Sequence, residues 1–200
     1  MAGGARRPGV RGAGPGDRLS AVAGVAAFAA WAGAAVIVLS DGRRGLAVGL
    51  GPVVIGFAAL AWVDGEWIGG ALLLLGGAIC VVELGRRGPK EWGLMPPGST
   101  PRLILVVVGG ILSLWVAVSV ASGPDAGLRF ASLAVLGLSA ARLLQGTRPV
   151  PVLAASAGLA IALAGASALV GTDAGFAPYL IGAAIAAGVA FLPVAEPRGA

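Results

Sequence analysis

The feature that most constrains this chain is a series of seven long apolar runs separated by short polar or Gly/Pro-rich breaks. A helix needs about 20 mostly apolar residues to cross the hydrocarbon core of a bilayer. Strands of a membrane barrel would alternate apolar and polar residues with a period of two, and these runs do not. We therefore predict an all-α, polytopic integral membrane helical bundle with seven transmembrane helices. The runs cover residues 19–39, 46–63, 67–84, 103–121, 127–144, 150–170 and 177–194.

Composition excludes the other broad classes of protein. Hydrophobic residues make up 58% of the chain and charged residues 12%, and the mean hydropathy is +0.94. A soluble domain carries about a quarter charged residues, and a disordered chain combines low hydrophobicity with high charge. The 35 glycines follow no Gly-X-Y period, which excludes a collagen-like helix.

The pattern divides the chain into three parts. Residues 1–18 hold four arginines among Gly and Pro and are predicted to be a flexible tail. Residues 19–195 form the transmembrane domain, and residues 196–200 a short polar stub. The start also resembles a secretory signal, with Ala30-Trp31-Ala32 as a cleavage site, but the apolar run continues to Leu39 and exceeds a usual signal core. We expect this segment to be retained.

The charges of alternate loops predict the orientation. One set of loops is rich in arginine, and the other set is acidic, with Arg129 as its one cation. Cytoplasmic loops of membrane proteins carry an excess of Lys and Arg. We therefore predict a location in the cell membrane with the basic loops and the C-terminus in the cytoplasm. The basic set contains Arg43, Arg44, Arg86, Arg87, Lys90, Arg102, Arg142, Arg148 and Arg198, and the acidic set contains Asp64, Glu66, Asp125 and Asp173.

The N-terminus conflicts with this scheme, because seven spans place the arginine-rich tail outside. A six-helix alternative keeps the tail inside. In that case either the run 19–39 does not cross, or the run 46–63, which contains Gly49, Gly51 and Pro52, is re-entrant. We favour seven helices because both runs are apolar and long enough to span.

The helical hairpins share a pattern of Asp at the outer turn and Arg near the inner end. This pattern indicates either an internal repeat or only the same membrane topology in each hairpin. We expect the outer aspartates to cap helix N-termini. Small residues recur at four-residue spacing in the last two runs, which lets helix backbones approach closely. We predict that Gly158 and Ala162 of the sixth run face Gly182 and Ala186 of the seventh. A related face in the third run carries Gly69, Gly70, Gly76 and Gly77.

The inventory of reactive residues is small. The chain has no histidine, one cysteine (Cys80) and one lysine (Lys90, in a loop), which argues against His-ligated metals, haem, Ser-His catalysis and a retinal Schiff base. Glu83, Arg129 and Arg142 lie near the ends of runs, where each is expected to pair locally or snorkel. A carboxylate metal site formed by the outer aspartates is conceivable. Capping is the better explanation, so we predict no catalytic, cofactor-binding or metal-binding residues.

These observations favour a structural, accessory or lipid-contacting membrane protein that is not an enzyme and has no cofactor. The alternative is a small transporter or channel subunit that acts as an oligomer, for which a broken helix at Gly49–Pro52 is the one candidate feature. The expected partners are the lipid bilayer and either another membrane protein or further copies of the chain. Nucleic acid is not expected despite the net charge of +5, because the arginines flank apolar runs. The basic loop 85–102 is interpreted as an ordinary cytoplasmic loop, with contact to anionic headgroups or a partner as the alternatives.

Overall fold

The computed structural model describes residues 15–87, 92–93, 100–120, 125–145, 148–170 and 175–193. All regular structure in these ranges is helical, which confirms the predicted all-α membrane bundle of seven helices. The predicted tail 1–18 overlaps the first helix, which begins at Pro15, whereas residues 1–14 and the stub 196–200 lie outside the described ranges. The helices are α1 (Pro15–Leu39), α2 (Arg43–Val63), α3 (Trp67–Arg86), α4 (Thr100–Val120), α5 (Ala126–Leu144), α6 (Pro149–Ala168) and α7 (Ala177–Ala190).

Five helices, α1, α2, α3, α5 and α6, are long and apolar enough to cross a membrane. The seventh is shorter than the sequence predicts, because α7 has 14 residues and ends at Ala190 rather than at 194. Proline lacks an N–H donor and disfavours helical conformation in the residue before it. Pro193 therefore accounts for the early end of this helix.

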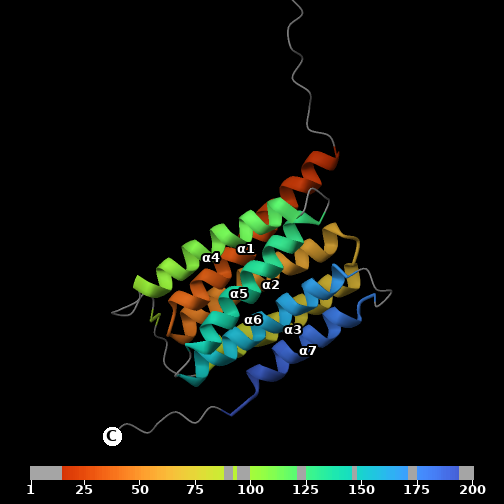
Figure 1. Ribbon diagram of the computed structural model, residues 1–200. Coiled ribbons are helices and arrows are strands. Elements are labelled where there is room, and N and C mark those ends of the chain that lie inside the picture. Colours follow the sequence, from red (N-terminus) through yellow and green to blue (C-terminus); the bar gives the residue numbers. More distant parts are fainter. Residues whose placement is uncertain are drawn as a thin grey trace, which may run out of the picture.

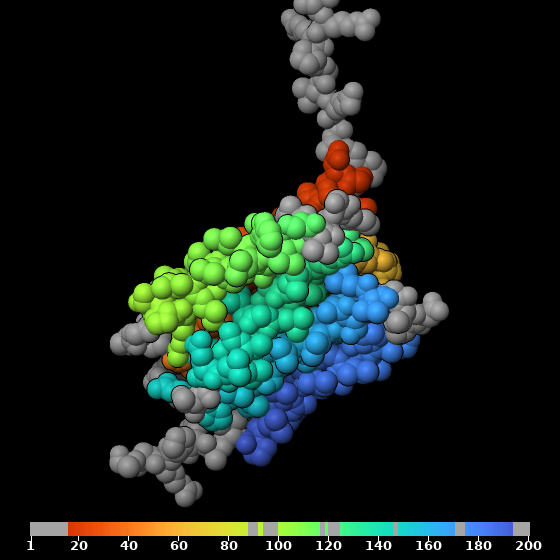
Figure 2. Space-filling view, viewed as in Figure 1, coloured from red at the N-terminus to blue at the C-terminus, as the bar shows by residue number. Residues whose placement is uncertain are grey.

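The helices lie side by side, with α4 along one edge of the bundle and α7 along the opposite edge (Figure 1). Helix α6 packs against α5, α7 and α2, and α1 packs against α2 and α5. In the space-filling view α4 forms a ridge along one side, beside the face made by α5, α6 and α7 (Figure 2). Successive helices alternate in direction, so the turns gather at two ends. We call the end that carries Asp41, Arg102 and Arg142 the basic end, and the end that carries Asp64, Glu66 and Asp125 the acidic end.

The second helix is continuous through the segment that sequence analysis treated as a candidate break. Pro52 lies inside α2, which runs unbroken from Arg43 to Val63. Gly49 packs against α1, where an added Cβ would lie 2.9 Å from the Ile37 nitrogen and 2.8 Å from the Gly33 oxygen. The helix break on which the re-entrant form of the six-helix alternative depends is therefore absent, and α1 packs alongside α2 within the bundle.

The contact between α6 and α7 exists as predicted, but it uses a different face of α6. Gly182 of α7 packs against Ala160 and Ala164 of α6, with the Ala160 oxygen 3.0 Å from where a Cβ would lie. Gly158 instead faces α5, where the corresponding distance to the Ser139 hydroxyl oxygen is 3.1 Å. The prediction of a Gly158–Gly182 seam is wrong because α6 is central, and small residues on several of its faces each meet a different neighbour.

The glycines of α3 likewise form two faces rather than one. Gly69 and Gly76 pack against Tyr179 and Ala183 of α7, whereas Gly70 and Gly77 pack against Trp62 and Val54 of α2. Adjacent positions on an α-helix face directions that differ by about 100°. This spacing lets α3 approach two neighbours closely, and it fixes Tyr179 at the acidic end.

Candidate functional site

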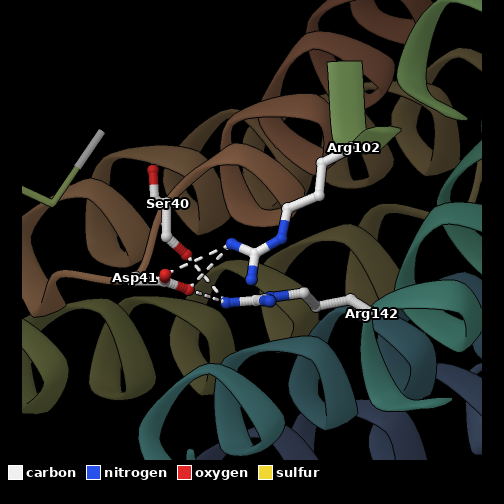
Figure 3. A network of polar contacts seen from close by, with 4 residues as sticks. All are labelled: Ser40, Asp41, Arg102 and Arg142. Atoms are coloured by element: carbon white, nitrogen blue, oxygen red, sulfur yellow. Dashed lines mark hydrogen bonds and ion pairs between the residues drawn. The ribbon is translucent and has the colours of Figure 1, made fainter. Parts of the chain in front are cut away.

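The basic end holds a cluster of charged side chains that come from three separate parts of the chain. The Asp41 carboxylate lies between the guanidinium groups of Arg102 and Arg142 (Figure 3). Arg102 donates to both carboxylate oxygens, at 3.1 and 3.2 Å. Arg142 donates to the same carboxylate and, at 3.1 Å, to the Ser40 carbonyl oxygen. We call these four residues the Asp41 cluster.

The Asp41 cluster is largely withdrawn from water. The side chain of Arg142 is 3% exposed, that of Asp41 14% and that of Arg102 23%. Burial alone would raise the pKa of Asp41, but the hydrogen bonds and positive charges of Arg142 and Arg102 outweigh it and hold the pKa below its usual value. Asp41 is therefore an ionised carboxylate that joins the α1–α2 turn to α4 and α5.

Backbone contacts hold the turn that presents Asp41. The Asp41 N–H donates to the Gly93 carbonyl at 3.0 Å, so part of the long basic loop folds onto this turn. Gly93 has a φ of +50° and lies directly against Gly42, a place where a side chain would be strained and would clash. Residues 88–91 and 94–99 of this loop, where contact with headgroups or a partner was considered, lie outside the described ranges.

A second ion pair at the basic end agrees with the sequence prediction. Glu83 of α3 pairs with Arg87, the C-cap residue that follows this helix, at 2.9 Å. Arg87 also donates to the Ala190 carbonyl at 3.1 Å and lies over the Phe191 ring, with 5.6 Å between guanidinium carbon and ring centroid. This local pair ties the ends of α3 and α7 together.

Arg142 does not behave as predicted. It neither pairs locally nor snorkels to water, because its partners lie 101 and 102 positions earlier in the sequence. Asp41 lies in the polar break between the first two apolar runs, and no local pattern predicts its contacts with Arg102 and Arg142. The contact of Arg142 with Ser40 was equally unexpected. An arginine inside an apolar run needs a partner within the protein, and this rule, applied to the few acidic residues of the same end, was the available signal.

The acidic end contains a surface pocket of about 270 Å³ that we call the acidic pocket. The α2–α3 turn contributes Asp64 and Glu66, the start of α5 contributes Asp125, the end of α6 contributes Ser167, and α7 contributes Tyr179. Gly65, with a φ of +87°, makes the tight turn that places Asp64 and Glu66 together. The described lining contains no basic side chain.

Neither of the two described outer aspartates makes the predicted capping hydrogen bond, although Asp125 occupies the N-cap position of α5. Asp64 follows the last residue of α2 and so occupies a C-cap position, where the negative end of the helix dipole is unfavourable for a carboxylate. Asp125 precedes α5, but its side chain makes no capping hydrogen bond. Asp173 lies outside the described ranges. No group of three His, Cys, Asp or Glu side chains among the described residues lies close enough to hold a metal ion directly.

Two side chains at the acidic pocket, Asp64 and Tyr179, are in unfavourable surroundings. Although Asp64 lies at the surface, partial burial and the nearby charge of Asp125 raise its pKa to about 6. Tyr179 is 1% exposed, and its hydroxyl has no hydrogen-bond partner among the described residues. Sequence analysis did not identify Tyr179, although a lone tyrosine at the start of an apolar run is a visible polar group.

Comparisons with known protein families, curated proteins and solved structures found no match for this chain. The Asp41 cluster joins helices, and the acidic pocket gathers carboxylates at the opposite end.

Proposed function

We propose that this membrane protein is a non-catalytic structural or accessory protein in which the bundle serves as a rigid scaffold. The observation that carries the proposal is the state of Arg142, the one charged residue classed as buried in the described part of the chain. Intramembrane charges mark substrate or ion paths by default. Here the charge is bound to Asp41 and Ser40 and joins α5 to the α1–α2 turn, which Arg102 in turn joins to α4.

The surface of the bundle supports residence in lipid. Large apolar side chains on α4 are exposed, including Ile111 at 62% and Trp115 at 67%. Near the acidic end, Trp62 and Trp67 stack with 6.2 Å between ring centroids, and Trp67 is 69% exposed. Tryptophan is enriched at the membrane–water boundary. These features support lipid-facing sides and a boundary at the level of the α2–α3 turn.

We further propose that the basic end faces the cytoplasm of a cell-membrane protein, which places the C-terminus inside. Reporter fusions after Asp64 and Asp125 should then report the outside, and fusions after Arg148 the inside. Two successive fusions on the same side would contradict this orientation.

The scaffold proposal is tested by isolating the full chain from native membranes in lipid nanodiscs and identifying cross-linked chains by mass spectrometry. We expect a stoichiometric membrane-protein partner or a defined homo-oligomer. Reconstituted protein that instead carries ions or solutes across vesicles, above the leak of empty vesicles, would favour the transport alternative. A transporter is expected to contain a broken helix, and α2 is unbroken at Gly49–Pro52, the segment where the sequence suggested a break.

A further inference from the structure

The described lining of the acidic pocket carries an excess of negative charge. Asp64, Glu66 and Asp125 line it without a basic side chain among the described lining residues. The last turn of α6 also lines the pocket, and terminal helix carbonyls lack intrahelical donors. The C-terminal ends of α2 and α6 add partial negative charge, but the first turns of α5 and α7, which contribute Asp125, Pro178 and Tyr179, add partial positive charge. The net charge of the pocket therefore comes from its carboxylates. Such a site attracts a cation.

The buried hydroxyl of Tyr179 is an independent indication of a ligand. Its ring packs against Gly69 of α3, and the charges of Asp64 and Glu66 act on its hydroxyl. Tyr179 lines the pocket, yet the hydroxyl has no partner among the described residues. Buried hydroxyl groups are nearly always hydrogen-bonded to protein or to ordered water. A water molecule held by a bound cation would supply the missing partner.

The geometry also limits which cation fits. Because no three acidic side chains among the described residues converge closely enough to ligate one ion directly, the site does not suit Ca²⁺, which takes six to eight oxygen ligands. Mg²⁺ keeps several of its waters and binds through one or two carboxylates. The cavity of about 270 Å³ has room for six waters at about 30 Å³ each.

We propose that the acidic pocket binds one hydrated divalent cation, best matched by Mg²⁺, through Asp64 and Asp125, with Glu66 and Tyr179 contacting its waters. The cation relieves the repulsion between carboxylates that come from the α2–α3 turn and from α5. Binding therefore joins these two segments at the acidic end. The site is independent of whether the protein acts as a scaffold or as a transporter.

The test is a titration of the full-length protein in detergent at pH 7.5 with MgCl₂, at ionic strength held constant with NaCl. Calorimetry should show saturable binding at one site, with a dissociation constant on the order of 0.1–1 mM. At 10 mM MgCl₂ the midpoint of thermal unfolding should rise by about 3 °C or more. Either an equal effect of NaCl or the absence of saturable binding up to 10 mM would overturn the proposal. Ca²⁺ binding more than about tenfold tighter than Mg²⁺ would overturn the choice of a hydrated ion.

Matched variants locate the site. Asp64→Asn and Asp125→Asn should each weaken Mg²⁺ binding about tenfold, because each removes one charged ligand. Tyr179→Phe, which removes only the hydroxyl, should weaken it by a few-fold. Glu83→Gln removes a carboxylate at the basic end and should leave Mg²⁺ binding unchanged. Two Asn variants guard against one of them failing to fold, and folded Asn variants that bind Mg²⁺ as the parent does would refute the site.

Discussion

The two ends of the bundle gather charged side chains from distant parts of the chain, but they balance the charges in opposite ways. At the basic end, Asp41 lies between two arginines, and its pKa is lowered. At the acidic end, Asp64 lies near Asp125, and its pKa is raised. Charges that are paired within the protein form a structural joint, whereas like charges that share a pocket favour a ligand. Substitutions at each end test this difference.

Arg142→Met should produce the largest loss of stability. It leaves the Asp41 carboxylate and the Ser40 carbonyl without their buried donor, and removing one partner of a buried ion pair costs about 3–5 kcal/mol. We expect a value near 3 kcal/mol, because Arg102 still contacts Asp41. Reversible unfolding in mixed micelles measures the change.

Arg148→Met is the matched control for Arg142→Met, because Arg148 is exposed at the same end. It should change the free energy of unfolding by less than about 0.5 kcal/mol. Equal effects of the two substitutions would mean that the Asp41 cluster is not a structural joint.

Gly49→Ala separates helix packing from charge at the basic end. The added methyl group would meet the backbone of α1 near Ile37, and overpacking of this kind costs about 1–3 kcal/mol. Gly51, two residues later on the same helix, has open space around the position of a Cβ. Gly51→Ala should therefore stabilise α2 slightly, by up to about 1 kcal/mol. Thermal unfolding of both variants measures these changes. Destabilisation by both would contradict the close packing of α1 against α2 at Gly49.

Tyr179→Phe should stabilise the protein when divalent cations are absent. The hydroxyl is buried without a partner among the described residues, and an unsatisfied buried polar group costs about 1–3 kcal/mol. We expect a gain of about 1 kcal/mol in a buffer that contains a chelator. Destabilisation under these conditions would show that the hydroxyl already has a partner.

The pH dependence of stability should carry a small signature of Asp64. Its pKa in the folded protein is about 6, above the usual 3.8, so its stabilising contribution is complete below about pH 4 and is lost as the pH rises through 6. Asp41, with its lowered pKa, stays ionised above pH 5 and therefore does not contribute to the change in stability between pH 5 and 7. Because Asp64 lies at the surface, screening limits the effect to about 1 kcal/mol, or 2–4 °C between pH 5 and 7. Asp64→Asn should remove this slope, and a parent-like slope in the variant would assign it to another group.

Local sequence patterns predicted the helices well because the bilayer imposes one simple rule, a continuous apolar stretch of sufficient length. The starts of α3 at Trp67 and α5 at Ala126 fall within one residue of prediction, and α7 ended early only because Pro193 was overlooked. The helix neighbours α6 and α7 were also predictable from their short connection. The face of α6 that meets Gly182 was not, because periodicity finds small residues without showing which neighbour each one meets.

The candidate sites depend on contacts between residues far apart in sequence, and this is why sequence analysis missed most of them. Arg142 and Asp41 are 101 residues apart, and nothing in either local sequence specifies the other. The role expected for Asp64 was wrong for a related reason, since an aspartate between two helices can follow one or precede the next. The absence of predicted catalytic, cofactor and metal residues stays a prediction.

The same isosteric substitution at both ends tests the central comparison most directly. Asp41→Asn and Asp64→Asn each remove one negative charge and keep the shape of the side chain. We would measure the unfolding midpoints of both variants and of the parent protein at pH 7.5 in buffer with a chelator. We expect opposite signs, with Asp41→Asn lowering the midpoint and Asp64→Asn raising it. Changes of the same sign at both ends would contradict the difference between the two ends.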